Sequence, residues 1–164
     1  MSKLIHLIKS VLILIATMNW ATIGLAQKKD VGFKPHIGFV RGKALDVCPI
    51  YGINFGGQFS ISIRSQFSIN PEISFIYLQS YESNMNTLLM PIYASYKVPI
   101  RQVNLNFNVG PCIQLTHSLD VGVSMKMEVE YNRWITAFNG SINFLDNTNP
   151  HILGLSFGYK FSLN

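Results

Sequence analysis

Charged residues, cysteines and long apolar runs are all scarce in this sequence of 164 residues. Charged side chains make up 13% of the chain, about half of the roughly 25% that is usual in soluble domains. Hydrophobic residues make up 48%, and mean hydropathy is +0.24. Beyond the N-terminal segment, however, no run approaches the about 20 apolar residues that a transmembrane helix needs. Together these shortages disfavour both an ordinary soluble domain and a helical membrane protein.

Signals of nucleic-acid binding and catalysis are missing as well. The net charge is +5, but the basic residues are scattered and form no patch. There is no P-loop, GxGxxG or CxxC motif, and His36, His117 and His151 lack metal-ligand spacing. A lipid hydrolase needs a paired serine and histidine, and adjacent residues such as His117 and Ser118 rarely form such a pair. We therefore expect no nucleic-acid partner, no metal, no cofactor and no enzymatic activity.

The N-terminus resembles a secretory signal peptide spanning residues 1–26. Lys3, His6 and Lys9 form a positive end, Val11–Thr17 is the centre of the apolar region, and Gly24-Leu25-Ala26 suits cleavage after the alanine. An uncleaved membrane anchor is the alternative. Export would place the two cysteines of the mature chain in an oxidising compartment, where they could form a disulfide or remain two separate small apolar residues. These cysteines are Cys48, in a predicted loop, and Cys112, in a predicted strand.

The mature chain is dominated by a hydrophobic period of two, which is typical of β-strands. Tyr51–Ile63 alternates without a break between apolar residues and Gly, Asn, Gln or Ser. Eight segments follow the pattern, each about as long as the 9–11 residues that a transmembrane strand needs. The segments are Val31–Arg41, Tyr51–Ile63, Phe67–Tyr77, Leu88–Val98, Val103–Leu115, Leu119–Tyr131, Trp134–Phe144 and Leu153–Leu163.

The connections between these segments alternate in length. The longer set, predicted to be external, comprises Gly42–Pro49, Ser80–Asn86, Thr116–Ser118 and Leu145–Pro150. The shorter set, predicted to face the periplasm, comprises Arg64-Ser65, Pro99–Gln102 and Asn132. Short inner turns, longer outer loops and an even strand count are typical of outer-membrane barrels.

The composition of the polar face indicates which face points inward. A soluble lipocalin-like barrel also alternates, but its apolar side chains lie inside. The polar positions here are mostly Gly, Ser, Asn and Gln, whereas a water-exposed surface is about 25–35% charged. We therefore expect the apolar face to contact lipid and the small polar residues to fill a narrow lumen. A soluble periplasmic ligand-binding barrel remains the alternative.

Seven charged residues occupy the alternate strand positions that are predicted to point inward, which we call the inward parity. The set includes both positive and negative charges. An eight-stranded barrel has room inside only for side chains, so these residues are expected to pair across the lumen in a structural network. The rival interpretation is a proton or ion path. The residues are Lys34, Glu72, Lys97, Asp120, Lys126, Glu128 and Lys160.

Aromatic residues and prolines add two further expectations. Aromatic girdles are expected at both membrane interfaces, from Tyr51 and Tyr77 at the outer ends of strands and from a second set at the inner ends. Proline cannot donate to a strand ladder, so bulges or local widening are expected at three prolines within strands. The inner aromatic set is Tyr96, Tyr131, Trp134, Tyr159 and Phe161, and the prolines are Pro71, Pro91 and Pro111.

Three motifs in sequence order resemble the PorT-like outer-membrane β-barrel family. They are a Pro-Glu strand within Gly52–Ser80, a hydrophobic-Pro strand ending in Tyr-Lys within Leu88–Pro99, and a Gly-Pro strand within Asn106–Leu115. Ser156–Leu163 also resembles the terminal-strand signal read by the barrel assembly machinery, although Asn164 follows its last apolar residue. The resemblance implies an outer-membrane barrel whose family namesake is linked to secretion. It carries over no catalytic or binding residue.

The sequence thus predicts an all-β protein, an eight-stranded antiparallel up-and-down transmembrane β-barrel over residues 27–164 after a signal peptide. The expected location is the outer membrane of a Gram-negative envelope, and the expected role is non-enzymatic, structural or interactive, linked to secretion or envelope integrity. Expected partners are outer-membrane lipid, the barrel assembly machinery during biogenesis, and other envelope proteins. An outer-membrane lipid-modifying enzyme is the alternative of a different class.

Overall fold

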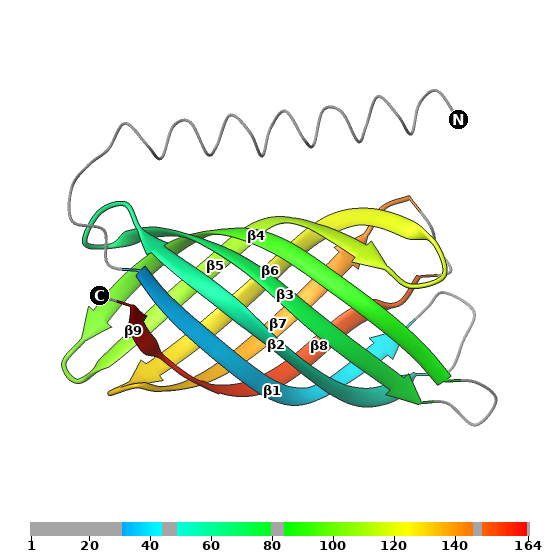
Figure 1. Cartoon of the computed structure of the whole chain (residues 1–164), viewed down its shortest axis with the longest axis horizontal. Coiled ribbons are helices and arrows are strands. Elements are labelled where there is room, and N and C mark those ends of the chain that lie inside the picture. Colours follow the sequence, from blue (N-terminus) through cyan, green and yellow to red (C-terminus); the bar gives the residue numbers. More distant parts are fainter. Residues whose placement is uncertain (1–30, 44–48, 80–83, 146–148, 164) are drawn as a thin grey trace.

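One closed antiparallel sheet forms the whole of the part described by the computed structural model, residues 31–43, 49–79, 84–145 and 149–163 (Figure 1). The predicted signal peptide, its cleavage after Ala26, and Cys48 lie outside these ranges. None of the described residues belongs to a helix long and apolar enough to cross a membrane. The strands are β1 Val31–Lys43, β2 Ile50–Ser62, β3 Phe67–Gln79, β4 Asn84–Ile100, β5 Val103–Leu115, β6 Leu119–Tyr131, β7 Trp134–Asn143, β8 His151–Tyr159 and β9 Phe161–Leu163.

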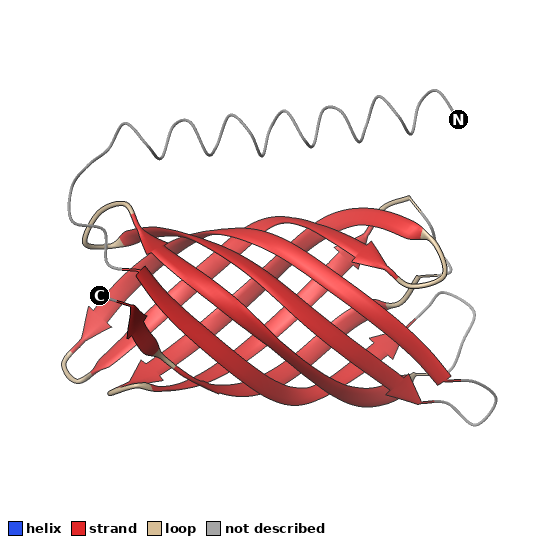
Figure 2. Ribbon diagram, in the orientation of Figure 1, coloured by secondary structure: helices blue, strands red, loops and turns tan. Residues whose placement is uncertain are grey.

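The sheet closes because β1 pairs with β2 on one side and with β8 and β9 on the other. β8 and β9 are two parts of one strand interrupted at Lys160. The register continues across the interruption, since His36 pairs with Gly158 and Phe33 with Phe161. The molecule is therefore an eight-stranded barrel, as predicted, and Figure 2 shows its all-strand wall. Closure leaves no unpaired sheet edge, which is the condition for a sheet to cross hydrocarbon.

The apolar residues point outward, as the sequence predicts. Ile37 and Phe39 are 61% and 70% exposed, while Asn54 and Glu128 in the lumen are 2% and 1% exposed. A soluble ligand-binding barrel has the opposite orientation, with its apolar face inside. The outer wall of this barrel therefore offers an apolar surface to its surroundings.

The predicted strand boundaries need one correction, and the prediction for the prolines is confirmed in one of its two forms. β4 is longer than predicted, because Asn84–Asn86 and Pro99-Ile100 belong to it rather than to connections. No bulge forms at the three prolines, and the local widening that was the other expectation is present: pairing with a neighbouring strand is interrupted beside Pro71, Pro91 and Pro111, and the register is the same before and after each gap. A missing N–H removes a ladder bond without requiring an extra residue.

The lumen is not polar throughout, which corrects a second expectation. Near the loop end, seven inward-facing apolar residues pack together, and none is more than 7% exposed. We call this cluster the apolar plug. Its members are Val40, Ile50, Ile76, Leu78, Leu89, Cys112 and Ile152.

Aromatic rings gather at the turn end of the barrel, where both termini of the described sheet lie (Figure 1). Phe67 contacts Tyr96 in a tilted arrangement with ring centroids 4.9 Å apart. Trp134 contacts Tyr159 at 5.2 Å, and Tyr159 contacts Phe161 at 5.0 Å. Paired aromatic rings at strand ends are the arrangement expected of an interfacial girdle.

Candidate functional site in the barrel lumen

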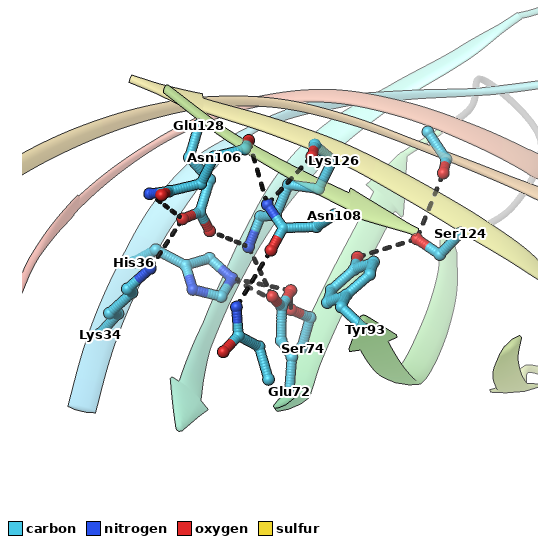
Figure 3. Close-up of polar contacts among 12 residues, drawn as sticks. Lys34, His36, Glu72, Ser74, Tyr93, Asn106, Asn108, Ser124, Lys126 and Glu128 are labelled. Carbon is cyan, nitrogen blue, oxygen red and sulfur yellow. Dashed lines mark hydrogen bonds and ion pairs between the residues drawn. The ribbon is translucent and has the colours of Figure 1, made fainter. Parts of the chain in front are cut away.

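A buried ionic cluster occupies the middle of the lumen, and four strands supply it. β1 contributes Lys34, β3 contributes Glu72, and β6 contributes Lys126 and Glu128. Residues two apart on a strand point to the same face, which explains why Lys126 and Glu128 enter the lumen together. Asn106 of β5 completes the set, and Figure 3 shows how these side chains converge.

The four charges pair with one another and sum to zero. Lys34 Nζ lies 2.7 Å from Glu128 Oε2, and Lys126 Nζ lies 2.5 Å from Glu72 Oε2 and 3.7 Å from Glu128 Oε1. Asn106 donates a hydrogen bond of 3.3 Å to Glu128. Each of these ionic side chains is at most 6% exposed. Burying a charge is costly unless it is paired and hydrogen-bonded, so every member depends on the others.

A histidine and a serine extend the cluster. His36 Nε2 lies 3.0 Å from Ser74 Oγ, and Ser74 donates a 2.8 Å hydrogen bond to Glu72 Oε1. Glu72 Oε1 lies 3.5 Å from the same ring nitrogen, Nε2. A hydrolytic triad instead places the carboxylate on the other ring nitrogen. The group therefore lacks the relay geometry of a serine nucleophile.

Space at this point of the lumen is too small for a substrate. A cavity of about 10 Å³ lies among Lys34, His36, Gln58, Lys126 and Glu128. That volume holds about one water molecule. Both amide atoms of Gln58 are buried there without a hydrogen-bond partner in the described structure, so a water is the group that fits.

The predicted network of seven residues separates into three groups and one isolated residue. Lys34, Glu72, Lys126 and Glu128 form the ionic cluster described above. Lys160 pairs at 2.9 Å with Glu130 nearer the turn end. Asp120 lies at the loop end, where it accepts hydrogen bonds from the backbone of Val121 and Leu145 and from Asn149. Lys97 is half-buried and forms no ion pair within the described ranges.

Several residues of this interior lie outside the network predicted from the sequence. His36 and Glu130 share the inward parity, but they were not included in the network. Tyr93, whose hydroxyl lies 2.9 Å from Ser124 Oγ, interrupts an otherwise apolar segment. The alternation of inward and outward positions is enough to place all three side chains in the lumen. Their partners on distant strands could not be predicted in this way, because they depend on the register around the whole barrel. The adjacent pair His117 and Ser118 lies in the β5–β6 connection, where Ser118 accepts a hydrogen bond from Asn149.

Comparison with known proteins identifies the fold. No family model and no curated protein matches the sequence. Among solved structures, Neisserial surface protein A matches with a TM-score of 0.64 and 10% identity, over 81% of this chain and 97% of that one. This chain has the fold of the small outer-membrane β-barrels.

Two more structures of this fold show how varied its functions are. Ail, the attachment invasion locus protein of Yersinia pestis, matches with a TM-score of 0.53 and 12% identity, over 82% of this chain and all of that one. The outer membrane enzyme PagL matches with a TM-score of 0.53 and 10% identity, over 78% and 99%. Such identities establish a shared fold, and function has to be argued from the site.

Proposed function

We propose that this protein is an integral outer-membrane barrel with a sealed lumen and a non-enzymatic, structural or interactive role in the envelope. The observation that carries the proposal is the pairing of an outward apolar wall with a lumen filled at two levels, the ionic cluster and the apolar plug. The wall suits acyl chains, and the two filled levels in the described part of the lumen argue against passage of solute. The similarity of fold to known outer-membrane barrels supports the location.

Membrane fractionation and gel migration test the location. The protein is expected in the outer-membrane fraction, and it should migrate differently on SDS gels before and after boiling, because a closed barrel resists SDS until heated. Recovery in the soluble fraction without a heat-dependent shift contradicts the proposal.

The finer proposal, from the PorT-like resemblance, is a link to secretion or envelope integrity through other envelope proteins. It predicts that deleting the gene changes the set of secreted proteins or admits large antibiotics. The candidate signal for the barrel assembly machinery is Ser156–Leu163, and this segment supplies most of the final strand of the barrel. Crosslinking from the loop end in whole cells is expected to capture an envelope protein. A deletion strain with unchanged secretion and permeability contradicts this role.

A lipid-modifying enzyme is the rival, and His36, Ser74 and Glu72 are the group that could suggest one. Their enclosure beside a cavity of about 10 Å³ argues against acyl transfer. Ser74→Ala is therefore expected to leave the envelope lipid profile unchanged by mass spectrometry. Loss of a deacylated lipid species in this variant, and its presence with the native protein, contradicts the non-enzymatic proposal.

A further inference from the structure

The exposed charges of the described barrel are all basic. Its four described carboxylate side chains, Glu72, Asp120, Glu128 and Glu130, are all buried in the lumen. Each of the three tight turns carries one exposed arginine, and none of these arginines forms an ion pair with another described residue. The arginines are Arg64, Arg101 and Arg133. The turn end of the described barrel is therefore a cationic rim beside the aromatic girdle.

Arg101 differs from the other two because it borders a groove on the outer wall. Ile100, Val103 and Tyr131 lie in one row across β4, β5 and β6, since Val103 pairs with both of the others. Ile100 and Tyr131 are 50% and 48% exposed, whereas Val103 between them is half-buried. The two protruding side chains thus form walls above a floor of Val103 and Leu105. The resulting groove is open on its outer side, has a volume of about 630 Å³ and has Arg101 at its turn end.

The backbone at Arg101 is also unusual. Its φ is 53°, in the left-handed region, where glycine and asparagine are preferred. The matching place in the β6–β7 turn is occupied by Asn132, with φ 55°. An arginine at such a position is strained, so its side chain is a candidate for a role that glycine could not fill.

We propose that this groove binds one anionic phospholipid, with an acyl chain on the Val103–Leu105 floor and its phosphate at the Arg101 guanidinium. A guanidinium can bind phosphate oxygens through two parallel hydrogen bonds. The neighbouring aromatic girdle marks the headgroup level, so a chain lying in the groove runs toward the bilayer interior. The site rests on the proposed membrane location, and its occupant is a lipid of the leaflet that the turns face.

Lipid retention measured by native mass spectrometry tests the site. The full chain is reconstituted in nanodiscs of equimolar phosphatidylglycerol and phosphatidylcholine, released, and analysed for bound lipid. The native protein is expected to retain one phosphatidylglycerol, because its net charge is negative, whereas the choline cation of phosphatidylcholine cancels the phosphate charge. Arg101→Gln is expected to lower the amount of phosphatidylglycerol bound per barrel about tenfold, the effect of losing a charge-assisted hydrogen bond to phosphate. Arg133→Gln is the matched control, since it removes the same charge from a turn that does not line this groove, and it is expected to keep the bound phosphatidylglycerol.

Two further variants separate lipid binding from folding. Arg101→Gly suits the left-handed backbone, so it should fold at least as well as the native chain while losing the bound lipid. Val103→Phe should fill the groove and lower retention with the charge still present. Equal loss in the Arg133 and Arg101 variants, or unchanged retention in Arg101→Gln, overturns the site. Failure of every variant and of the native chain to enter nanodiscs instead contradicts the proposed membrane location.

Discussion

At the scale of single residues, the ionic cluster depends most on Glu128. Its carboxylate contacts Lys34, Lys126 and Asn106. Glu128→Gln leaves two buried lysines with one carboxylate between them, so we expect a loss of about 3–5 kcal/mol in the free energy of unfolding. The measurement is urea unfolding in lipid vesicles.

Lys97→Gln is the control for this loss, because Lys97 is half-buried and forms no ion pair among the described residues. Its effect is expected to stay within about 0.5 kcal/mol. Similar losses in the two variants would mean that ionic pairing is not what Glu128 contributes.

Two buried glutamines give a second prediction at this scale. Neither amide atom of Gln58 has a described partner, whereas Gln114 bonds Thr116, Pro150 and Asn143. Gln58 lines the cavity that has room for one water, whereas Gln114→Leu would leave the protein groups that bond Gln114 unsatisfied, at a cost of about 1–3 kcal/mol. We therefore expect Gln114→Leu to destabilise the barrel by about that amount and Gln58→Leu to destabilise it by less. Unfolding midpoints provide the measurement. Equal destabilisation by both would show that the direct hydrogen bonds of Gln114 contribute no more than the surroundings of Gln58.

At the scale of the strand, β1 offers two inward glycines with different surroundings. A Cβ on Gly38 would meet the Leu155 carbonyl oxygen and the Ser156 backbone, whereas a Cβ on Gly32 has its nearest neighbour at 3.4 Å. Gly38→Ala is therefore expected to destabilise the barrel by about 1–3 kcal/mol, through displacement of backbone, and Gly32→Ala to be tolerated. Heat-dependent gel migration reports both. Equal tolerance would show that β1 and β8 can separate without loss.

Strand periodicity explains how much of this architecture the sequence could predict. Uninterrupted alternation such as Tyr51–Ile63 specifies both the strand and its orientation, because lipid and lumen select opposite residues. The apolar plug could not be predicted in this way. Near Ile76 and Leu78 both faces of β3 are apolar, since the lumen itself is apolar there, and the alternation disappears.

The sequence also could not predict which charged residues form ion pairs across the lumen. The alternation of inward and outward positions places Lys34, Glu72 and Lys126 inside the barrel, but it does not predict how far along the barrel axis each side chain lies. The stagger between neighbouring strands sets which charges lie at one level, and it depends on the register of the whole closed sheet. For that reason Lys160 was grouped with the ionic cluster, although its partner is Glu130.

At the scale of the whole molecule, two independent layers close the lumen. The ionic cluster fills the middle with charges that neutralise one another, and the apolar plug fills the loop end. A single opening in either layer leaves the other in place. We therefore expect the native protein to show no steady conductance in planar lipid bilayers.

The two layers can be tested separately and together. Leu78→Ala opens the plug, and the pair Glu72→Ala and Lys126→Ala removes one ion pair without leaving a net charge; each change alone is expected to keep the barrel closed. Combining them should give measurable conductance, because water can then enter from the loop end and reach the middle of the lumen. Heat-dependent migration establishes that each variant is a folded barrel before it is measured. Conductance in the native protein contradicts a sealed lumen, and conductance in either partial variant shows that one layer alone is the barrier.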